Sequence, residues 1–412
     1  MSNQKQHLKL LESETSFRTM CLPSVTSVTF YQGEPPIKLL RHRVAQIIAL
    51  NPWLAGRLVS HKGEKVIEYD PNPPAHVSKC HFRVIKHATL CYSDSYGKIV
   101  NEIGKAKDVV VKRSFQCLNR NESLYNVTLI MHPKTNDFAL VVSASHIMGG
   151  SHTFYSLYAM LDTPAVPVKL LSERQFEYEA QRDHVMGAPA TFFTTFWFFV
   201  GFAFLCIRGT FIWLLNHMIM GKETWNLYTI NEDWVKEQKK TYNTEQSWIS
   251  ANDALAAWFF KSCKCAVGCM AINFRDRLMN IGQKHAGNYE DGILYLPEDF
   301  ENPRLIRESI SGKIYRRVVT GLVEISIAKI IRCNIGLITN WSNFYTELTF
   351  ENCKSLFHLP VLEETPTFIS NAVIFCQKKN RLGILINLPN MHLEENGPLV
   401  PFDNTQYSAQ IV

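Results

Sequence analysis

One short stretch of the chain joins an apolar run, a histidine, two glycines and a helical pattern. Residues 138–144 (FALVVSA) are nearly all apolar and predict a buried strand, which runs into His146 and then into Gly149 and Gly150. Glycine lets a ligand approach the backbone closely, so a histidine at a strand end beside two glycines suits a general base. The alternative for an isolated histidine at this place is a packed or solvated side chain.

A helix is predicted to begin directly after the glycines. Its apolar side chains recur at helical spacing, at Phe154, Leu157, Tyr158 and Leu161. Ser151 is expected to cap this helix, since serine is among the preferred N-cap residues. His152 falls in the first turn, where we expect a solvated side chain.

The remaining sequence shows both strand and helix patterns. The expected elements are a strand at 25–31, a helix at 37–50, a strand at 65–69, a hairpin of 125–131 with 138–144, a charged helix or loop at 231–242, a capped helix from 250, a strand at 335–339 and a hairpin of 371–376 with 382–388.

Composition narrows the class of protein. With 412 residues, 46% hydrophobic and 19% charged, the chain has material for two domains or one large pseudo-repeated one. The net charge is only +6 and no dense Lys/Arg block appears, so no nucleic-acid partner is expected. The eleven cysteines lack regular spacing, which suits a reducing compartment. Cys263, Cys265 and Cys269 match no zinc spacing and are expected to continue an apolar helix, so no metal is predicted.

A long apolar run interrupts the middle of the chain. Residues 190–207 contain 18 positions without a charge, and a further apolar run follows Arg208. Because a membrane span needs about 20 apolar residues, we predict that the segment 190–220 enters a membrane. The alternative is a buried core helix.

Several segments, taken together in chain order, resemble one enzyme family. They are 52–58 (PWLAGRL), His146 with 153–155 (TFY), 250–253 (SAND), 273–277 (NFRDR) with 287–288 (GN), and 339–341 (TNW). Over residues 24–390 the sequence resembles the CoA-dependent acyltransferases of the chloramphenicol acetyltransferase-like, or condensation-domain-like, fold, and most closely the BAHD-type branch. His146 occupies the histidine of that branch's His-x-x-x-Asp-Gly motif.

The resemblance implies an α/β (α+β) fold of two lobes, each a mixed sheet with packed helices. The histidine lobe would span 1–163 and the second lobe 236–412, with a crossover at 164–235 that carries the apolar segment. In this family the two lobes form one active-site tunnel. A single membrane pass would separate them, so the segment is expected to enter and leave on the same face, as a shallow hairpin or an interfacial helix.

Two motif positions depart from the family. Gly150 stands where the motif has aspartate, followed by Ser151 in place of glycine, and the Asp-Phe-Gly-Trp-Gly segment appears as 349–353 (TFENC). In the family that aspartate anchors the histidine loop through an arginine. Its loss is expected to loosen the loop or to leave an arginine in need of another partner.

The implied chemistry is direct acyl transfer. His146 would take a proton from a hydroxyl or amine acceptor, which then attacks the thioester of acyl-CoA, the co-substrate; no bound cofactor is expected. A positioned base typically contributes about 10²–10⁴-fold. The candidate oxyanion donors are Asn340, Trp341 and Ser342, whose other role would be packing and turn formation.

The place of the apolar segment suggests a lipophilic acceptor and lobes on the cytoplasmic side of a membrane, with the endoplasmic reticulum favoured. Two alternatives stay open. The chain is then either a catalytically inactive relative that binds a lipid or protein partner, as the altered motifs would suggest, or a membrane protein whose lobes are interaction domains.

Overall fold

The computed structural model describes residues 5–86, 90–132, 135–187, 225–245, 247–319, 334–363, 369–388 and 401–402. The predicted membrane segment, 190–220, lies outside these residues. Within the described ranges, no helix has both the length and the apolar character that crossing a bilayer requires.

The first large sheet has the strand order β12-β2-β7-β6-β5. Its strands are β2 (Val25–Gln32), β5 (Phe82–Lys86), β6 (Tyr125–Met131), β7 (Asp137–Ala144) and β12 (Lys354–Pro360). All neighbours are antiparallel except β5 and β6. β2 and β7 are buried along nearly their whole length, which is why their sequences are apolar or hydroxylated rather than alternating with charges. The predicted hairpin of 125–131 with 138–144 is confirmed.

The second large sheet has the order β10-β9-β11-β13-β14-β8. Its strands are β8 (Asn226–Thr229), β9 (Cys265–Asn273), β10 (Glu290–Tyr295), β11 (Asn334–Asn340), β13 (Ser370–Lys378) and β14 (Arg381–Asn387). β11 runs parallel to both of its neighbours and the other pairs are antiparallel. The mixed α/β architecture with two sheets agrees with the predicted fold class.

The smallest sheet, of order β1-β4-β3, lies beside the first lobe. Its strands are β1 (Gln6–Lys9), β3 (Arg57–His61) and β4 (Glu64–Tyr69). The helices are α1 (Glu12–Thr15), α2 (Phe17–Cys21), α3 (Ile37–Leu50), α4 (Val77–His81), α5 (Tyr96–Lys105), α6 (Ser114–Cys117), α7 (Ser151–Ala159), α8 (Tyr178–Met186), α10 (Glu232–Tyr242), α11 (Ala251–Ser262), α12 (Pro297–Phe300) and α13 (Pro303–Ser311). Short 3₁₀ turns are η1 (Pro52–Ala55), η2 (His146–Met148) and η3 (Ser342–Phe344).

The sequence predicted the start of helix α11 correctly but not its end. Ser250 accepts from the backbone of Asp253 while the Asp253 carboxylate accepts from Ser250 N, a capping box that confirms the predicted helix start. The expectation that Cys265 and Cys269 continue this helix is wrong. Lys264 adopts a φ of 48°, which ends the helix, and both cysteines lie on β9.

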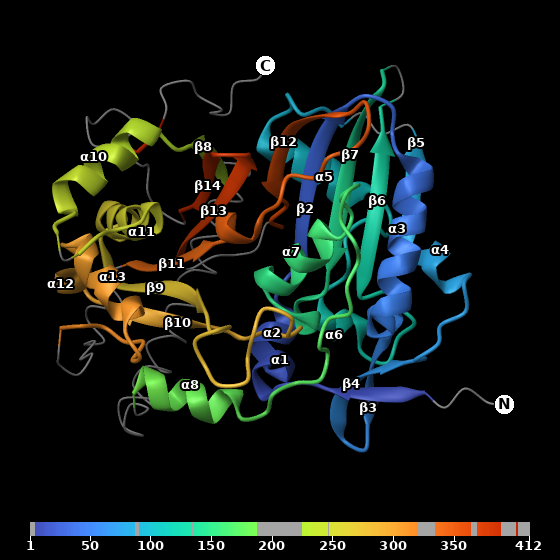
Figure 1. Ribbon diagram of the computed structural model, residues 1–412, viewed down its shortest axis with the longest axis horizontal. Coiled ribbons are helices and arrows are strands. Elements are labelled where there is room, and N and C mark those ends of the chain that lie inside the picture. The colour runs from blue at the N-terminus through green and yellow to red at the C-terminus, as the bar shows by residue number, and fades with distance from the viewer. Residues whose placement is uncertain are drawn as a thin grey trace, which may run out of the picture.

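The two sheets occupy opposite sides of the molecule, and α7 lies against the first sheet on the side that faces the second (Figure 1). There are two apolar cores, and the second sheet contributes to both: Val373 and Phe375 of β13 belong to the first core, and Ala372 and Ile374 to the second. The first core also takes in Trp341, Phe350 and Leu359, so residues from the C-terminal part of the chain pack into the histidine lobe. Strand β12, from the same part, completes the first sheet at the edge of β2.

Candidate active site

His146 lies where the chain leaves β7 and turns into α7. After β7 the chain passes Ser145, whose N–H donates to the Leu124 carbonyl at 2.8 Å, and then enters η2. The His146 side chain is half-buried. Its Nδ1 atom is buried without a hydrogen-bond partner of ordinary geometry.

Burial lowers the pKa of His146. The Glu290 carboxylate is the largest influence in the opposite direction, followed by the carbonyl of His146 itself, and Glu14 acts in the same sense. Arg18, on α2, lowers the pKa further. A neutral imidazole at neutral pH is the form that accepts a proton.

Gly149 and Gly150 are required for different reasons. Gly149 has a φ of 154°, and a Cβ there would lie 2.5 Å from the Cβ of Thr153. Gly150 has a φ of −77° and a ψ of −165°, a backbone that any residue adopts. The space beside it is filled, however, because a Cβ at Gly150 would lie 2.6 Å from the carboxyl carbon of Glu290.

Glu290 engages the first turn of α7. Its Oε1 accepts from the Ser151 hydroxyl at 3.1 Å and from the His152 N–H at 3.3 Å. The prediction that Ser151 caps this helix is wrong, since Gly150 is the N-cap and has no side chain to accept a bond. The role passes to a carboxylate from a distant strand, which satisfies an amide that the helix itself leaves unpaired.

A buried ion pair supports the same loop from the other side. The Arg174 Nε atom lies 2.9 Å from Glu14 Oε2, and both side chains are fully buried. Arg174 Nη2 donates to the carbonyls of Ile147 at 3.4 Å and Met148 at 3.3 Å. Glu14 also accepts from the N–H of Asn288 at 2.8 Å. The residues that follow His146 are therefore tied to α1 and to the second lobe.

A second buried arginine lies near Glu290. Arg275, in the segment that resembles the family's arginine-rich stretch, is 3% exposed. Its Nη2 donates to the Gly287 carbonyl at 2.7 Å and to Thr153 Oγ1 at 3.1 Å. Burial lowers its pKa to about 10, while Glu290 acts to raise it. This arginine is thus supported mainly by neutral acceptors.

His152 is buried, which corrects the expectation of a solvated side chain. Its Nε2 lies 2.7 Å from Gln283 Oε1, and its ring packs edge-on against Phe344 with a centroid distance of 5.4 Å. Burial, with Arg275 as the next cause, lowers its pKa to about 4. The helix face that carries it is covered by the second lobe rather than by water.

The predicted oxyanion donors lie at the end of β11, in the second lobe. Asn340 Oδ1 accepts from the N–H and the hydroxyl of Ser342, at 2.9 and 2.7 Å. Asn340 Nδ2 donates to Asn252 Oδ1 at 3.1 Å, and Trp341 N–H donates to the Ile374 carbonyl at 2.8 Å. These groups form a local network, and their role toward an oxyanion stays a prediction.

Helix α7 follows the turn after β7 that carries His146, called the first corner here, and it contacts the turn after β11 that carries Trp341 and Ser342, called the second corner. The Tyr155 ring lies edge-on to Trp341, with centroids 6.3 Å apart. Its hydroxyl lies 3.0 Å from His358 Nε2, and Thr29 Oγ1 lies 2.8 Å from His358 Nδ1. Burial lowers the pKa of His358 to about 3, so this imidazole is a neutral structural link between α7, β2 and β12.

The altered segment 349–353 docks at the far end of α7. Thr349 donates through its N–H and its hydroxyl to Asp162 Oδ1, at 2.6 and 2.8 Å, and its carbonyl accepts from Thr163. Phe350, the residue that the family segment shares, is 5% exposed in the first core. The segment keeps a packing role although most of its motif is changed.

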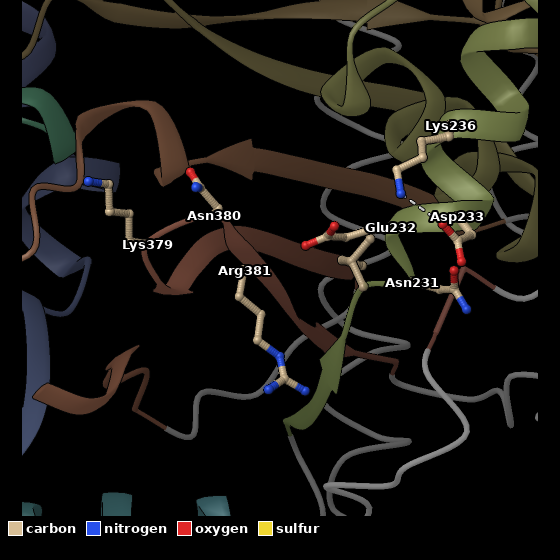
Figure 2. A pocket seen from close by; sticks show the side chains of 8 residues that line it. Asn231, Glu232, Asp233, Lys236, Lys379, Asn380 and Arg381 are labelled. Carbon is tan, nitrogen blue, oxygen red and sulfur yellow. Dashed lines mark hydrogen bonds and ion pairs between the residues drawn. The ribbon is translucent and has the colours of Figure 1, made fainter.

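A polar pocket lies elsewhere in the second lobe. It has a volume of about 540 Å³ and is lined by the end of β8, the first turn of α10 and the β13–β14 turn. Figure 2 shows Lys236 directed at Asp233, with a separation of 2.8 Å, and Glu232 between these residues and Arg381. None of the predicted site residues lines this pocket.

Sequence reasoning missed Glu290, Glu14 and Arg174. The one signal for them was the absent motif carboxylate at Gly150, which left either a loose loop or an arginine with a new partner. The structure favours the second outcome, because carboxylates from α1 and β10 are present on both sides of the histidine loop.

No protein-family model and no curated protein matches the sequence, but solved structures match the fold. TRI101 of F. sporotrichioides, complexed with coenzyme A and T-2, has a TM-score of 0.58 at 12% identity, over 92% of this chain and 94% of that one. The first condensation domain of the CDA synthetase gives 0.57 at 9% identity, over 93% and 90%. Polyketide synthase associated protein 5 from Mycobacterium tuberculosis gives 0.57 at 11% identity, over 94% of both chains.

These likenesses extend over nearly the whole chain. They confirm the predicted chloramphenicol acetyltransferase-like fold, which the BAHD-type resemblance and the condensation domains share. At identities this low they establish the fold alone, and function has to be argued from the site.

Proposed function

We propose that this chain is an acyltransferase that moves an acyl group from acyl-CoA to a hydroxyl or amine acceptor, with His146 as the general base. The observation that carries the proposal is the His146 corner itself. The ring lies at a strand end with Nδ1 buried and burial favouring the neutral form, so Nε2 is the nitrogen proposed to meet the acceptor. The acceptor proton goes to Nε2 as the acceptor oxygen or nitrogen attacks the thioester carbonyl. The C–S bond of the tetrahedral intermediate then breaks, and the His146 imidazolium returns the proton to the leaving CoA thiolate.

Acyl-CoA is proposed as the co-substrate because the similar TRI101 structure contains coenzyme A. Asn340, Trp341 and Ser342 are proposed to donate to the oxyanion, since Trp341 packs against Tyr155 of α7. The Ser342 donors would have to leave Asn340 Oδ1 to do so, whereas Asn340 Nδ2 has a second hydrogen beyond the one given to Asn252. No bound cofactor takes part in this mechanism.

The acceptor is proposed to be lipophilic. This rests on the uncharged run 190–207 in the connection between the lobes, which would bring the protein to a membrane through residues 190–220. We further propose that both lobes lie on the cytoplasmic side, with the endoplasmic reticulum as the favoured membrane.

The test is acceptor-dependent release of CoA by the full chain reconstituted in membranes, with lipid and water-soluble acceptors compared. His146→Ala is expected to lower the rate by about a hundredfold or more, because it removes the base. His152→Ala, which removes a neighbouring buried histidine, is the matched control and is expected to lose less than about tenfold. Equal losses in the two variants would contradict the assignment of His146.

A second candidate function is that of an inactive relative that binds a lipid or partner protein. Gly150 and the altered segment 349–353 favour it. Binding of acyl-CoA without turnover of any acceptor would support this candidate. Turnover confined to water-soluble acceptors would contradict the proposal of a lipophilic acceptor.

A further inference from the structure

Glu290 fills the place that a side chain at position 150 would occupy. A Cβ on Gly150 would lie 2.6 Å from Glu290 Oε1 and 2.7 Å from Oε2. The backbone at Gly150 does not itself demand glycine. The Glu290 carboxylate therefore explains why position 150 is a glycine, because a side chain there would occupy the same space as the carboxylate.

We propose that Glu290 is the positioning residue of His146, supplying from β10 the carboxylate that position 150 lacks. This inference deepens the proposed function and rests on it for the catalytic part of its test. The aspartate of the related motif and Glu290 would bring the same chemical group to the start of α7, one from within the loop and one from 140 residues downstream (290 against 150).

The contacts of the carboxylate fix the turn that follows His146. Glu290 Oε1 accepts from Ser151 Oγ and from His152 N, the first donors of α7. A negative charge at a helix N-terminus is stabilised by the unpaired amides and the helix dipole. On the other side of the loop, Arg174 donates to the carbonyls of Ile147 and Met148. A carboxylate thus accepts from one amide and one hydroxyl, and a guanidinium donates to two carbonyls, within one short segment.

Glu290 also acts on the proton affinity of the base. The charged groups that influence His146 are Glu290 from β10, Glu14 from α1 and Arg18 from α2. When His146 takes a proton, the nearby carboxylate stabilises the imidazolium that forms, while burial opposes it. Removal of the Glu290 charge leaves one carboxylate against Arg18 and therefore makes His146 a weaker base.

The first experiment removes the charge and keeps the shape. Glu290→Gln in the full chain is expected to lower the pKa of His146, followed by NMR of the imidazole ring, and to lower kcat about tenfold with KM for acyl-CoA nearly unchanged. Asp291→Asn is the matched control. That neighbouring carboxylate pairs with Arg182 at 3.1 Å and is 38% exposed, so its loss should move neither reading. Equal effects of the two variants would overturn the proposal.

The second experiment relocates the carboxylate. Gly150→Asp alone places a second carboxylate on Glu290 and should slow turnover and speed amide exchange over residues 146–152. Glu290→Ala alone should do the same by removing the acceptor of the His152 N–H and of the Ser151 hydroxyl. Together, Gly150→Asp and Glu290→Ala should restore most of both readings. Losses that simply add in the double variant would overturn the proposal.

The readings separate this inference from the proposed function. If no variant turns over any acceptor while the pKa change and the exchange rescue are present, only the proposed function fails. If turnover depends on His146 but Gly150→Asp is tolerated beside Glu290, only the positioning role fails.

Discussion

The two corners of the candidate site have the same plan and different supports. In the first lobe, β7 is followed by Ser145 and the 3₁₀ turn η2; in the second, β11 is followed by Trp341 and the 3₁₀ turn η3. The second corner is held by neutral groups, through bonds between Asn340 and Ser342 and through bonds to Asn252 and Ile374. The first is held by Glu290, Glu14 and Arg174, which come from other elements.

This difference shows how one chain secures a polar turn in two ways. Neutral amide and hydroxyl groups close the second corner at small individual energies, about 0.5–1.5 kcal/mol per hydrogen bond. Buried charged side chains stabilise the first corner, and they do so only when each charge has its partner. The corner that carries the proposed base is thus the one more sensitive to distant substitutions.

The largest effect is expected from breaking the buried pair under the first corner. Arg174→Met keeps the bulk of the side chain but leaves Glu14 buried without a counter-charge, and should lower the free energy of unfolding by about 3–5 kcal/mol. Chemical denaturation measures it. The matched control is Lys9→Met in the exposed pair with Glu64, 3.1 Å apart, which should change stability by less than about 0.5 kcal/mol.

A double variant isolates the cause of that loss. Glu14→Met together with Arg174→Met removes both charges, and should recover part of the stability. If Arg174→Met costs no more than the exposed control, the first corner is not held by charge and the comparison fails.

A smaller effect is expected from acid, at the helix that joins the corners. The folded pKa of His358 is lowered to about 3 by burial, whereas an unfolded histidine titrates near 6.5. As pH falls below about 6.5, the unfolded chain gains a proton that the folded chain does not, so stability present at higher pH is lost progressively toward pH 3. The loss from this one group is about 2 kcal/mol at pH 5.

Denaturation curves between pH 7 and 5 test this link. His358→Gln should flatten the pH dependence, although it lowers stability at pH 7 as well. His76→Gln, at an exposed histidine, should leave the slope as it is. An unchanged slope in His358→Gln would assign the acid sensitivity to another buried histidine, such as His152.

The smallest effect is expected at the second corner. Asn340→Ala removes the acceptor of Ser342 and the donor to Asn252, and should cost about 1 kcal/mol. The His146 ring signals in NMR should stay in place, because the network is local. A shift of those signals as large as that caused by Arg174→Met would mean that the two corners are one unit.

Short-range signals made much of the fold predictable. The α3 helix, the β6–β7 hairpin and the capped helix after Ser250 each depend on residues within a short window, and all are confirmed. The position of His146 at a strand end followed from the same kind of pattern.

The supports of the histidine loop were not predictable in this way. Glu14 and Arg174 lie 160 positions apart, and Ser151 and Glu290 lie 139 apart. The sequence does not show which helix N-terminus a given carboxylate contacts, because tertiary packing determines that contact. The sequence did show that a carboxylate was missing, because Gly150 stands where the motif has aspartate.

The course of the first sheet has a consequence for how the protein is made. β2 leaves the ribosome long before β12, yet its outer edge is covered by β12, residues Lys354–Pro360. Until then the nascent histidine lobe presents an open strand edge, the kind of surface that pairs with other chains. Synthesis as far as Pro360 must therefore precede closure of the sheet, and fragments that end before β12 should be prone to aggregate.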